Sequence, residues 1–188
     1  MLSKIAHKLL YRLTADLPYR EIKDEGKDYL ERYYLCTHKG KRYYLHCFLN
    51  SDPGRDLHSH KWHAWSFILC GWYWEQLSWG TRKVRWFNRI TPDTFHRVVL
   101  PPVLDSVLVY MGQGRYRKVQ AVPTGKTQPC WTLFCHNAAN DVETWGFKRS
   151  LDEAEPGAWY MEPYKYEKEG NQKDWWLTAK TRREVKGA

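Results

Sequence analysis

The sequence predicts an all-β sandwich or barrel, preceded by one short amphipathic helix. Short runs rich in Tyr, Trp, Val and Ile follow one another, with turn residues between them, and such spacing is typical of β-sandwiches and barrels. Aromatic residues make up 16% of the chain, and their large rings suit strands and ligand pockets. A length of 188 residues fits one domain with a substantial core.

The first segment, residues 2–13, has the apolar spacing of an amphipathic helix. Its apolar residues recur on one helical face, at Leu2, Ile5, Leu9, Leu10 and Leu13. Pro18 ends the pattern. The segment lacks the apolar core and small-residue cleavage site of a secretory signal. We expect it to dock onto the domain or onto a second subunit; a helix lying on a membrane surface is the alternative.

The remaining elements are expected to be strands, followed by a tail of different character. Strands are expected at 29–36, 43–49, around His58 and His60, and at 66–76, 84–87, 95–100, 107–111, 131–136 and 143–147, with a hairpin turn at Lys39-Gly40 and a Gly/Arg/Lys-rich connection around 112–125. From residue 150 the chain becomes charged, yet its tryptophans indicate packing onto the barrel. The predicted division is 1–18 for the helix, 19–149 for the barrel and 150–188 for a C-terminal extension.

Cysteine content and hydropathy indicate a soluble cytoplasmic protein. The five cysteines form no CxxC pair and leave an odd thiol, which favours reduced, mostly buried thiols. Mean hydropathy is −0.73, and no apolar run approaches the roughly 20 residues that span a bilayer. We therefore expect no membrane span.

The net charge of +9 is concentrated in one region. Residues 82–118 contain the cations Arg82, Lys83, Arg85, Arg89, Arg97, Arg115, Arg117 and Lys118. Arginines beside aromatic rings suit phosphates and stacked bases. Three interpretations stay open: a solvated surface, a site for an anion such as a nucleotide or sugar phosphate, and a nucleic-acid surface. No helix-turn-helix, zinc-finger or RNP signature supports the last, and Walker A, GxGxxG and GxSxG sequences are absent.

Three histidines carry the chemistry of the chain. His58 and His60 are two residues apart, so they lie on one face of a strand, and His96 follows on a later strand. Three neutral imidazoles that converge in this way bind a divalent metal and leave coordination positions open. Two alternatives also stay open: hydrogen-bonded core histidines, or a former metal site that has become a ligand pocket.

These residues resemble the motifs of the cupin superfamily. The resemblance covers about residues 43–148 and rests on Leu57-His58-Ser59-His60-Lys61-Trp62-His63, Leu69-x-Gly71, Phe95-His96-Arg97, Trp131-Thr-Leu133 and Trp145-Gly-Phe147. It is nearest to small cupin-like proteins of bacteria and phages. The family's metal-binding Glu would fall at Ala64 or Trp65, which cannot coordinate. The resemblance therefore implies a double-stranded β-helix, or jelly-roll barrel, of the three-histidine variant.

The resemblance also implies a chemistry, a ligand set and a substrate. Three-histidine cupins typically carry out iron-dependent oxygenation of small molecules, so Fe(II) is expected, with Mn, Ni or Zn as alternatives. Three neutral ligands leave the 2+ charge uncompensated, which favours an anionic substrate. His63 is a candidate fourth ligand if the strand bulges, whereas Glu75 lies far along the next strand. The candidate substrate contacts are Arg55, Arg97, Trp65 and Tyr73, and His46 is expected to be structural or to line the pocket.

A second class of function competes with the enzyme. The missing Glu, and the absence of an evident general acid or base, favour a non-catalytic cupin barrel that binds an anionic ligand or a partner macromolecule. The complete His-x-His…His set favours the metal-dependent enzyme. Strands of cupin sandwiches often pair across a dimer, so the resemblance also implies a homodimer.

Overall fold

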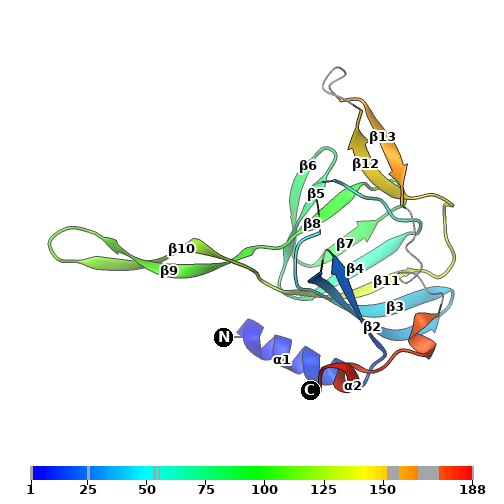
Figure 1. Ribbon diagram of the computed structural model, residues 1–188, viewed down its shortest axis with the longest axis horizontal. Coiled ribbons are helices and arrows are strands. Elements are labelled where there is room, and N and C mark those ends of the chain that lie inside the picture. Colours follow the sequence, from blue (N-terminus) through cyan, green and yellow to red (C-terminus); the bar gives the residue numbers. More distant parts are fainter. Residues whose placement is uncertain are drawn as a thin grey trace.

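The computed structural model describes residues 2–24, 26–52, 54, 56–151, 157–164 and 174–187. Its larger sheet has six antiparallel strands in the order β1-β2-β3-β11-β4-β7 (Figure 1). These strands are β1 (Tyr19–Asp24), β2 (Lys27–His38), β3 (Lys41–Phe48), β4 (Ala64–Cys70), β7 (Phe87–Ile90) and β11 (Cys130–Asn137). The expected β2–β3 hairpin is confirmed. Lys39 and Gly40 form its turn, with φ angles of 47° and 69°.

The smaller sheet faces the larger one and consists of two parts. The first part has the order β6-β5-β8, and the second is the β12–β13 hairpin. Their strands are β5 (Tyr73–Leu77), β6 (Gly80–Val84), β8 (His96–Val99), β12 (Gly146–Ser150) and β13 (Trp159–Pro163). The backbone around His58 joins the two parts, because His58 forms isolated bridges to both His96 and Phe147. The predicted strand around His58 and His60 is therefore only a short bridging segment.

The core and a cavity lie between the two sheets, so the expected all-β jelly roll of the cupin type is confirmed. Inward-facing residues of both sheets form one of the buried clusters, which contains Tyr73, Val84, Val98, Leu100 and Cys130. Side chains alternate along each strand, and the opposite face of the larger sheet packs against the N-terminal helix.

One long predicted strand, residues 66–76, is in fact two strands in different sheets. Gly71 separates β4 from β5 and has a φ of +89°. A Cβ at this position would lie 2.7 Å from the carbonyl oxygen of Pro129. Both the backbone angle and the close approach require glycine, so the chain crosses from one sheet to the other here. Periodicity alone did not reveal the break, because both strands are rich in aromatic and apolar residues.

Helix α1 (Leu2–Thr14) packs on the outer face of the larger sheet. Ala6, Leu10 and Tyr11 contact the buried cluster that contains Trp131, and the Trp131 Nε1–H donates to His7 Nδ1 at 2.9 Å. Another side of the same helix is open, as shown by the exposed side chains of Ile5, Leu9 and Leu13. No helix in the described part of the chain is long and apolar enough to cross a membrane.

The described parts of the tail return to the body of the molecule. Strand β12 crosses the predicted boundary at residues 149 and 150, since it pairs with β13 over Gly146–Ser150. The 3-10 helix η1 (Trp175–Leu177) places the Trp176 ring in a stack on Tyr34, with ring centroids 4.3 Å apart. A capping box between Thr181 and Glu184 begins helix α2 (Arg182–Lys186).

A long β-hairpin, which we call the arm, projects away from both sheets (Figure 1). It consists of β9 (Pro102–Tyr110) and β10 (Tyr116–Thr127). The sequence predicted only part of β9 and treated most of β10 as a connection, because its cations and glycines resemble those of a loop. Strands β1 and β13 were also not predicted.

Candidate metal centre

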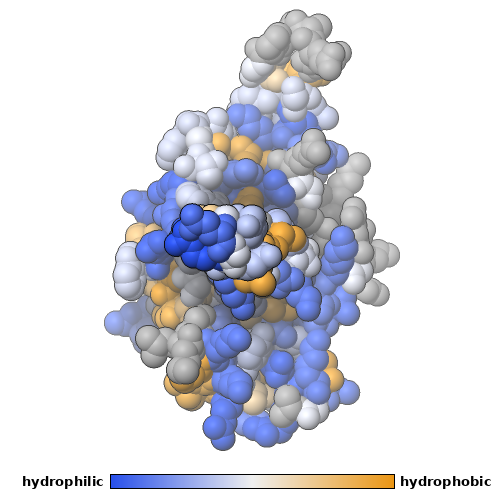
Figure 2. All heavy atoms as spheres, turned by 90° about the vertical axis from the view of Figure 1, so that its left-hand side faces the viewer, coloured by the Kyte–Doolittle hydropathy of each residue, from blue (hydrophilic) through white to orange (hydrophobic). Residues whose placement is uncertain are grey.

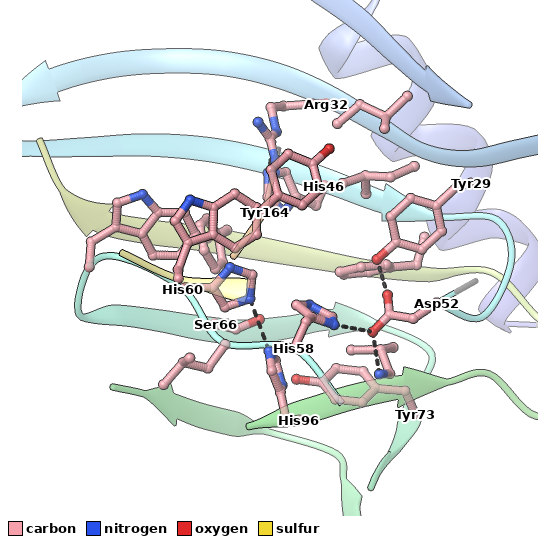
Figure 3. A pocket seen from close by; sticks show the side chains of 18 of the residues that line it. Tyr29, Arg32, His46, Asp52, His58, His60, Ser66, Tyr73, His96 and Tyr164 are labelled. Carbon is pink, nitrogen blue, oxygen red and sulfur yellow. Dashed lines mark hydrogen bonds and ion pairs between the residues drawn. The ribbon is translucent and has the colours of Figure 1, made fainter. Parts of the chain in front are cut away.

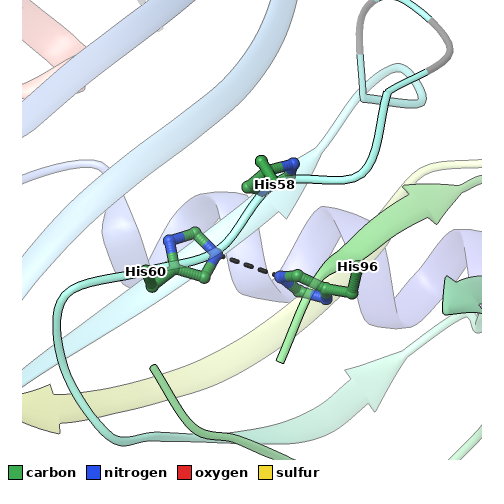
Figure 4. A group of neighbouring side chains, drawn as sticks. All are labelled: His58, His60 and His96. Atoms are coloured by element: carbon green, nitrogen blue, oxygen red, sulfur yellow. Dashed lines mark hydrogen bonds between the residues drawn. The ribbon is translucent and has the colours of Figure 1, made fainter. Parts of the chain in front are cut away.

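His58, His60 and His96 converge in the structure on one point between the sheets (Figure 4). Each can offer one ring nitrogen as a ligand, and these nitrogens all lie within 4.8 Å of one another. His58 and His96 are held by the backbone, because each donates its N–H to the other's carbonyl oxygen at 2.9 Å. His60 is two residues further along the bridging segment and turns its ring toward His96.

The spacing of the nitrogens suits a metal ion. The Nε2 atoms of His60 and His96 are 3.0 Å apart. Two imidazole nitrogens at about 2.1 Å from a metal would be about 3.0 Å apart at a right angle and about 3.4 Å apart at the tetrahedral angle. The donor set therefore fits a divalent cation, and the same 3.0 Å separation also allows a hydrogen bond between the two rings.

Burial keeps the first two histidines in the form that binds a metal. Desolvation lowers the pKa of His58 to about 4, although the nearby Asp52 carboxylate opposes the shift. Desolvation also lowers the pKa of His60 well below its usual value, and the neighbouring histidines add to the effect. At neutral pH both rings are therefore neutral and have a lone pair available for coordination.

Glu75 holds His96 from behind. This carboxylate is fully buried on β5, and its Oε1 accepts a hydrogen bond from His96 Nδ1 at 2.9 Å. With the proton on Nδ1, the Nε2 atom of His96 presents its lone pair to the cluster. A carboxylate behind a ligating histidine is a common feature of metal sites. The sequence suggested Glu75 only as a remote substitute ligand, and the structure instead places it behind the cluster.

A polar network makes the burial of Glu75 possible. Its Oε1 also accepts from Asn88 Nδ2 at 2.6 Å, and its Oε2 accepts from Arg82 Nε at 2.7 Å. Burial alone would raise the pKa of Glu75, but the hydrogen bonds from His96, Asn88 and Arg82 lower it. Glu75 is therefore an ionised, hydrogen-bonded anchor. The sequence contained a signal for it, since Glu75 is the acidic residue within an otherwise apolar and aromatic run.

A second carboxylate, Asp52, stands behind His58 (Figure 3). Its Oδ2 lies 3.9 Å from His58 Nδ1 and accepts from the Val98 N–H at 2.5 Å. Its Oδ1 accepts from the Tyr29 hydroxyl. Hydrogen bonds from donors other than the histidines therefore fix the positions of both carboxylates, Asp52 and Glu75, beside the histidine rings.

His60 has aromatic rather than acidic neighbours. Its ring stacks on Trp62, with centroids 4.6 Å apart and an interplanar angle of 8°. The Trp145 ring stacks on it more loosely, at 6.2 Å and 24°. These rings restrict the orientation of the imidazole, and Trp62 and Trp145 both line the cavity beside it.

The cluster opens into a cavity of about 230 Å³ between the sheets. Aromatic and aliphatic side chains form most of its wall, and the polar side chains are few. The lining residues used below are Arg32, His46, Asp52, Trp62, Trp145 and Tyr164, together with the three histidines. Ligand pockets for drug-sized molecules span about 300–1,000 Å³, so this cavity suits a smaller molecule.

Some of the other predicted site residues line the cavity, and others do not. Tyr73 lines the cavity, as does His46. Trp65 is not among the lining residues, and Lys41 Nζ stands 4.0 Å from the centroid of its ring. Arg97 also lies outside the cavity wall, where its guanidinium donates to the carbonyl oxygen of Asp52. Arg55 lies outside the described residues.

His63 does not join the three-histidine cluster. Its Nδ1 lies 3.1 Å from Asp141 Oδ2, and its backbone N–H donates to the same oxygen at 2.6 Å. The bulge that would turn His63 toward the metal is not present. The bridging segment instead ends at His60, and the chain leaves toward β4.

Comparisons with solved structures find cupin folds at low sequence identity. No protein-family model and no curated protein matches the chain. A cupin-2 domain protein from Rhodospirillum rubrum is 13% identical, with a TM-score of 0.43 over 67% of this chain and 72% of its own. A cupin-2 conserved barrel domain protein from Rhodopseudomonas palustris is 13% identical, with a TM-score of 0.44 over 67% and 74%. The Fe(II) form of HppE is 14% identical, with a TM-score of 0.41 over 64% and 56%.

The architecture of the chain and its three-histidine cluster both agree with what the sequence motifs predicted. Two facing antiparallel sheets enclose a cavity, and His58, His60 and His96 meet in it at the positions that the motifs predicted. The chain therefore has the all-β, cupin-type jelly-roll fold and the three-histidine cluster that its sequence motifs predicted.

Proposed function

We propose that this protein is a metal-dependent enzyme, a mononuclear Fe(II) oxygenase that acts on a small anionic molecule. The observation that carries the proposal is the three-histidine cluster at the wall of a largely apolar cavity. His58, His60 and His96 would hold the metal, and neither Asp52 nor Glu75 would contact it. Mn, Ni and Zn are the alternative ions.

The metal would supply open coordination positions at which a substrate and O₂ meet. The chain's own residues would do the rest. Glu75 would orient His96 through its hydrogen bond, Asp52 would stand 3.9 Å behind His58, and the aromatic and aliphatic wall would contact the reacting molecule. Three neutral ligands leave the charge of the ion uncompensated, so an anionic substrate would be favoured over a neutral one.

Oxygen consumption tests this proposal. The metal-free protein would be reconstituted with Fe(II) and mixed with a panel of small organic acids in an oxygen electrode. We expect substrate-dependent uptake that is lost in His96→Ala and in protein loaded with Zn(II). Stoichiometric metal without uptake for any acid would favour the alternative function, a non-catalytic barrel that captures an anionic ligand or a partner macromolecule.

The basic region of residues 82–118 does not form one surface, which weakens the proposal of a nucleic-acid partner. Arg82 contacts the buried Glu75, and Lys83 Nζ stands 3.5 Å from the centroid of the Trp72 ring. Arg115 and Arg117 lie on the arm, which projects away from the sheet that contains Arg82 and Lys83. We propose a cytoplasmic location, which the five free cysteines support.

We also propose that the protein is a homodimer in which the arm of one copy covers the other. An isolated two-stranded hairpin is marginally stable in water, yet the described side chains of the arm are all at least partly exposed. Its large exposed apolar residues are Leu108, Val109, Tyr110, Met111, Tyr116 and Val122. Figure 2, which looks onto the arm from its tip, shows hydrophilic and hydrophobic residues side by side on it. The open side of α1 offers a second apolar surface, at Ile5, Leu9 and Leu13.

Light scattering measures the oligomeric state directly. We expect twice the chain mass of 22.6 kDa for the native protein and the single mass for Leu108→Glu, because a charge in the covered surface opposes association. Gln120→Glu adds the same charge to an exposed polar position of the arm and should remain dimeric. A monomeric native protein, or an unchanged dimer in Leu108→Glu, would contradict the arrangement.

A further inference from the structure

Arg32 brings a positive charge to the cavity without a matching carboxylate. The residue lies on β2, opposite His46 on β3, and both line the cavity (Figure 3). Arg32 Nε donates to His46 Nε2 at 3.1 Å, and the guanidinium lies 5.5 Å from the centroid of the Tyr44 ring. Among the described residues, no carboxylate forms an ion pair with it. Its other N–H donors are thus available to a ligand.

The neighbours of Arg32 cannot neutralise it. A guanidinium remains charged in proteins, whereas burial lowers the pKa of His46 well below its usual value and leaves that ring neutral. Asp52 is the one acidic side chain among the described residues that line the cavity, and its oxygens accept from Val98 and Tyr29. An unpaired cation in an apolar cavity is unfavourable, so the site favours an anion that binds it.

The shape of the cavity defines that anion further. Arg32 and the three histidines line the same cavity of about 230 Å³, so one small molecule can contact both. Arg32 is the one cationic side chain other than histidine among the described lining residues, and a single positive charge is matched by a monoanion. The planar guanidinium binds a carboxylate through two parallel hydrogen bonds. Trp62, Trp145 and Tyr164 provide flat apolar walls.

We propose that Arg32 binds the carboxylate of a small, flat organic acid whose opposite end reaches the three-histidine cluster. His46 is a positioning residue in this arrangement, since it holds the Nε side of the guanidinium and leaves the other side to the ligand. The binding step requires only this chain. The role of the acid as a substrate rests on the function proposed above.

Calorimetric titration of the metal-free protein tests the inference. The probes are benzoate, its neutral isostere benzamide, and inorganic phosphate. We expect benzoate to bind at least about tenfold more tightly than benzamide or phosphate, as a charge-assisted hydrogen bond requires. Equal binding of benzoate and benzamide, or no binding of benzoate, would overturn the proposal. Tighter binding of phosphate would overturn the choice of a carboxylate.

Variants separate this inference from the metal site. Arg32→Gln should weaken benzoate binding by about 10- to 100-fold, and Arg32→Lys should weaken it less, because a lysine keeps the charge but not the planar pair of donors. Arg117→Gln on the exposed arm is the matched control and should bind normally. The metal content of Arg32→Gln should equal that of the native protein.

A purely structural role for Arg32 predicts a different result. Arg32→Met removes the unpaired charge and should melt at or above the native temperature without ligand. Benzoate should raise the melting temperature of the native protein and leave that of Arg32→Met unchanged. A strong loss of stability in Arg32→Met, with benzoate still binding to it, would overturn the assignment.

Discussion

Replacing His60 by alanine is expected to abolish retention of a divalent metal while the barrel stays folded. The substitution removes one of three nitrogens that lie within 4.8 Å of one another. Loss of a residue that only orients a ligand typically lowers metal affinity about 10- to 100-fold, so loss of a ligand itself should exceed that range. Metal content by mass spectrometry and affinity by competition with a chelator measure the effect, and circular dichroism checks the fold.

His63→Ala is the matched control for this prediction. His63 lies three residues from His60 in the same segment, but it contacts Asp141 rather than the cluster. We expect its metal content and affinity to equal those of the native protein. Unchanged metal in His60→Ala, or loss of metal in His63→Ala, would contradict the assignment of the ligands.

Glu75→Gln is expected to weaken both the metal site and the fold. The carboxylate accepts hydrogen bonds from His96, Asn88 and Arg82, and an amide must turn its NH₂ group toward at least one of these donors. A buried group left unsatisfied costs about 1–3 kcal/mol, which corresponds to a fall in melting temperature of about 2–12 °C for a chain of this length. Metal affinity should fall about 10- to 100-fold.

Thermal unfolding of the metal-free protein separates the two effects of Glu75→Gln. Glu143→Gln makes the same chemical change at an exposed position and should alter neither stability nor affinity. A native melting temperature with unchanged metal affinity would show that the network does not support His96. Complete loss of metal, as in His60→Ala, would show that Glu75 is itself a ligand.

The fold could be predicted from the sequence where local patterns are strong. The β2–β3 hairpin followed from its turn at Lys39-Gly40, and the N-terminal helix followed from its apolar spacing. The break at Gly71 could not be predicted in the same way, because it depends on the approach of Pro129 from a distant part of the chain. The arm was missed because its second strand has the composition of a loop and, among the described strands, pairs with β9 alone.

The candidate site was predictable in its three histidines but not in their surroundings. The His-x-His spacing and His96 were sufficient to bring the cluster together. Strand pairing positions both Arg32 and Glu75. Arg32 lies opposite His46 on the paired strand, and Glu75 contacts His96 from the neighbouring strand. Such pairings are set by tertiary structure. One sign was available, since both are charged residues within runs rich in aromatic side chains.

The most direct test of the account is the metal content of the protein purified without a histidine tag. We predict close to one divalent ion per chain, either as purified or after reconstitution with Fe(II), and none in the His58→Ala/His60→Ala variant. Iron as the retained ion would support the oxygenase proposal, while manganese, nickel or zinc would support the site with a different chemistry. Absence of bound metal after reconstitution with each of these four ions would contradict the central claim.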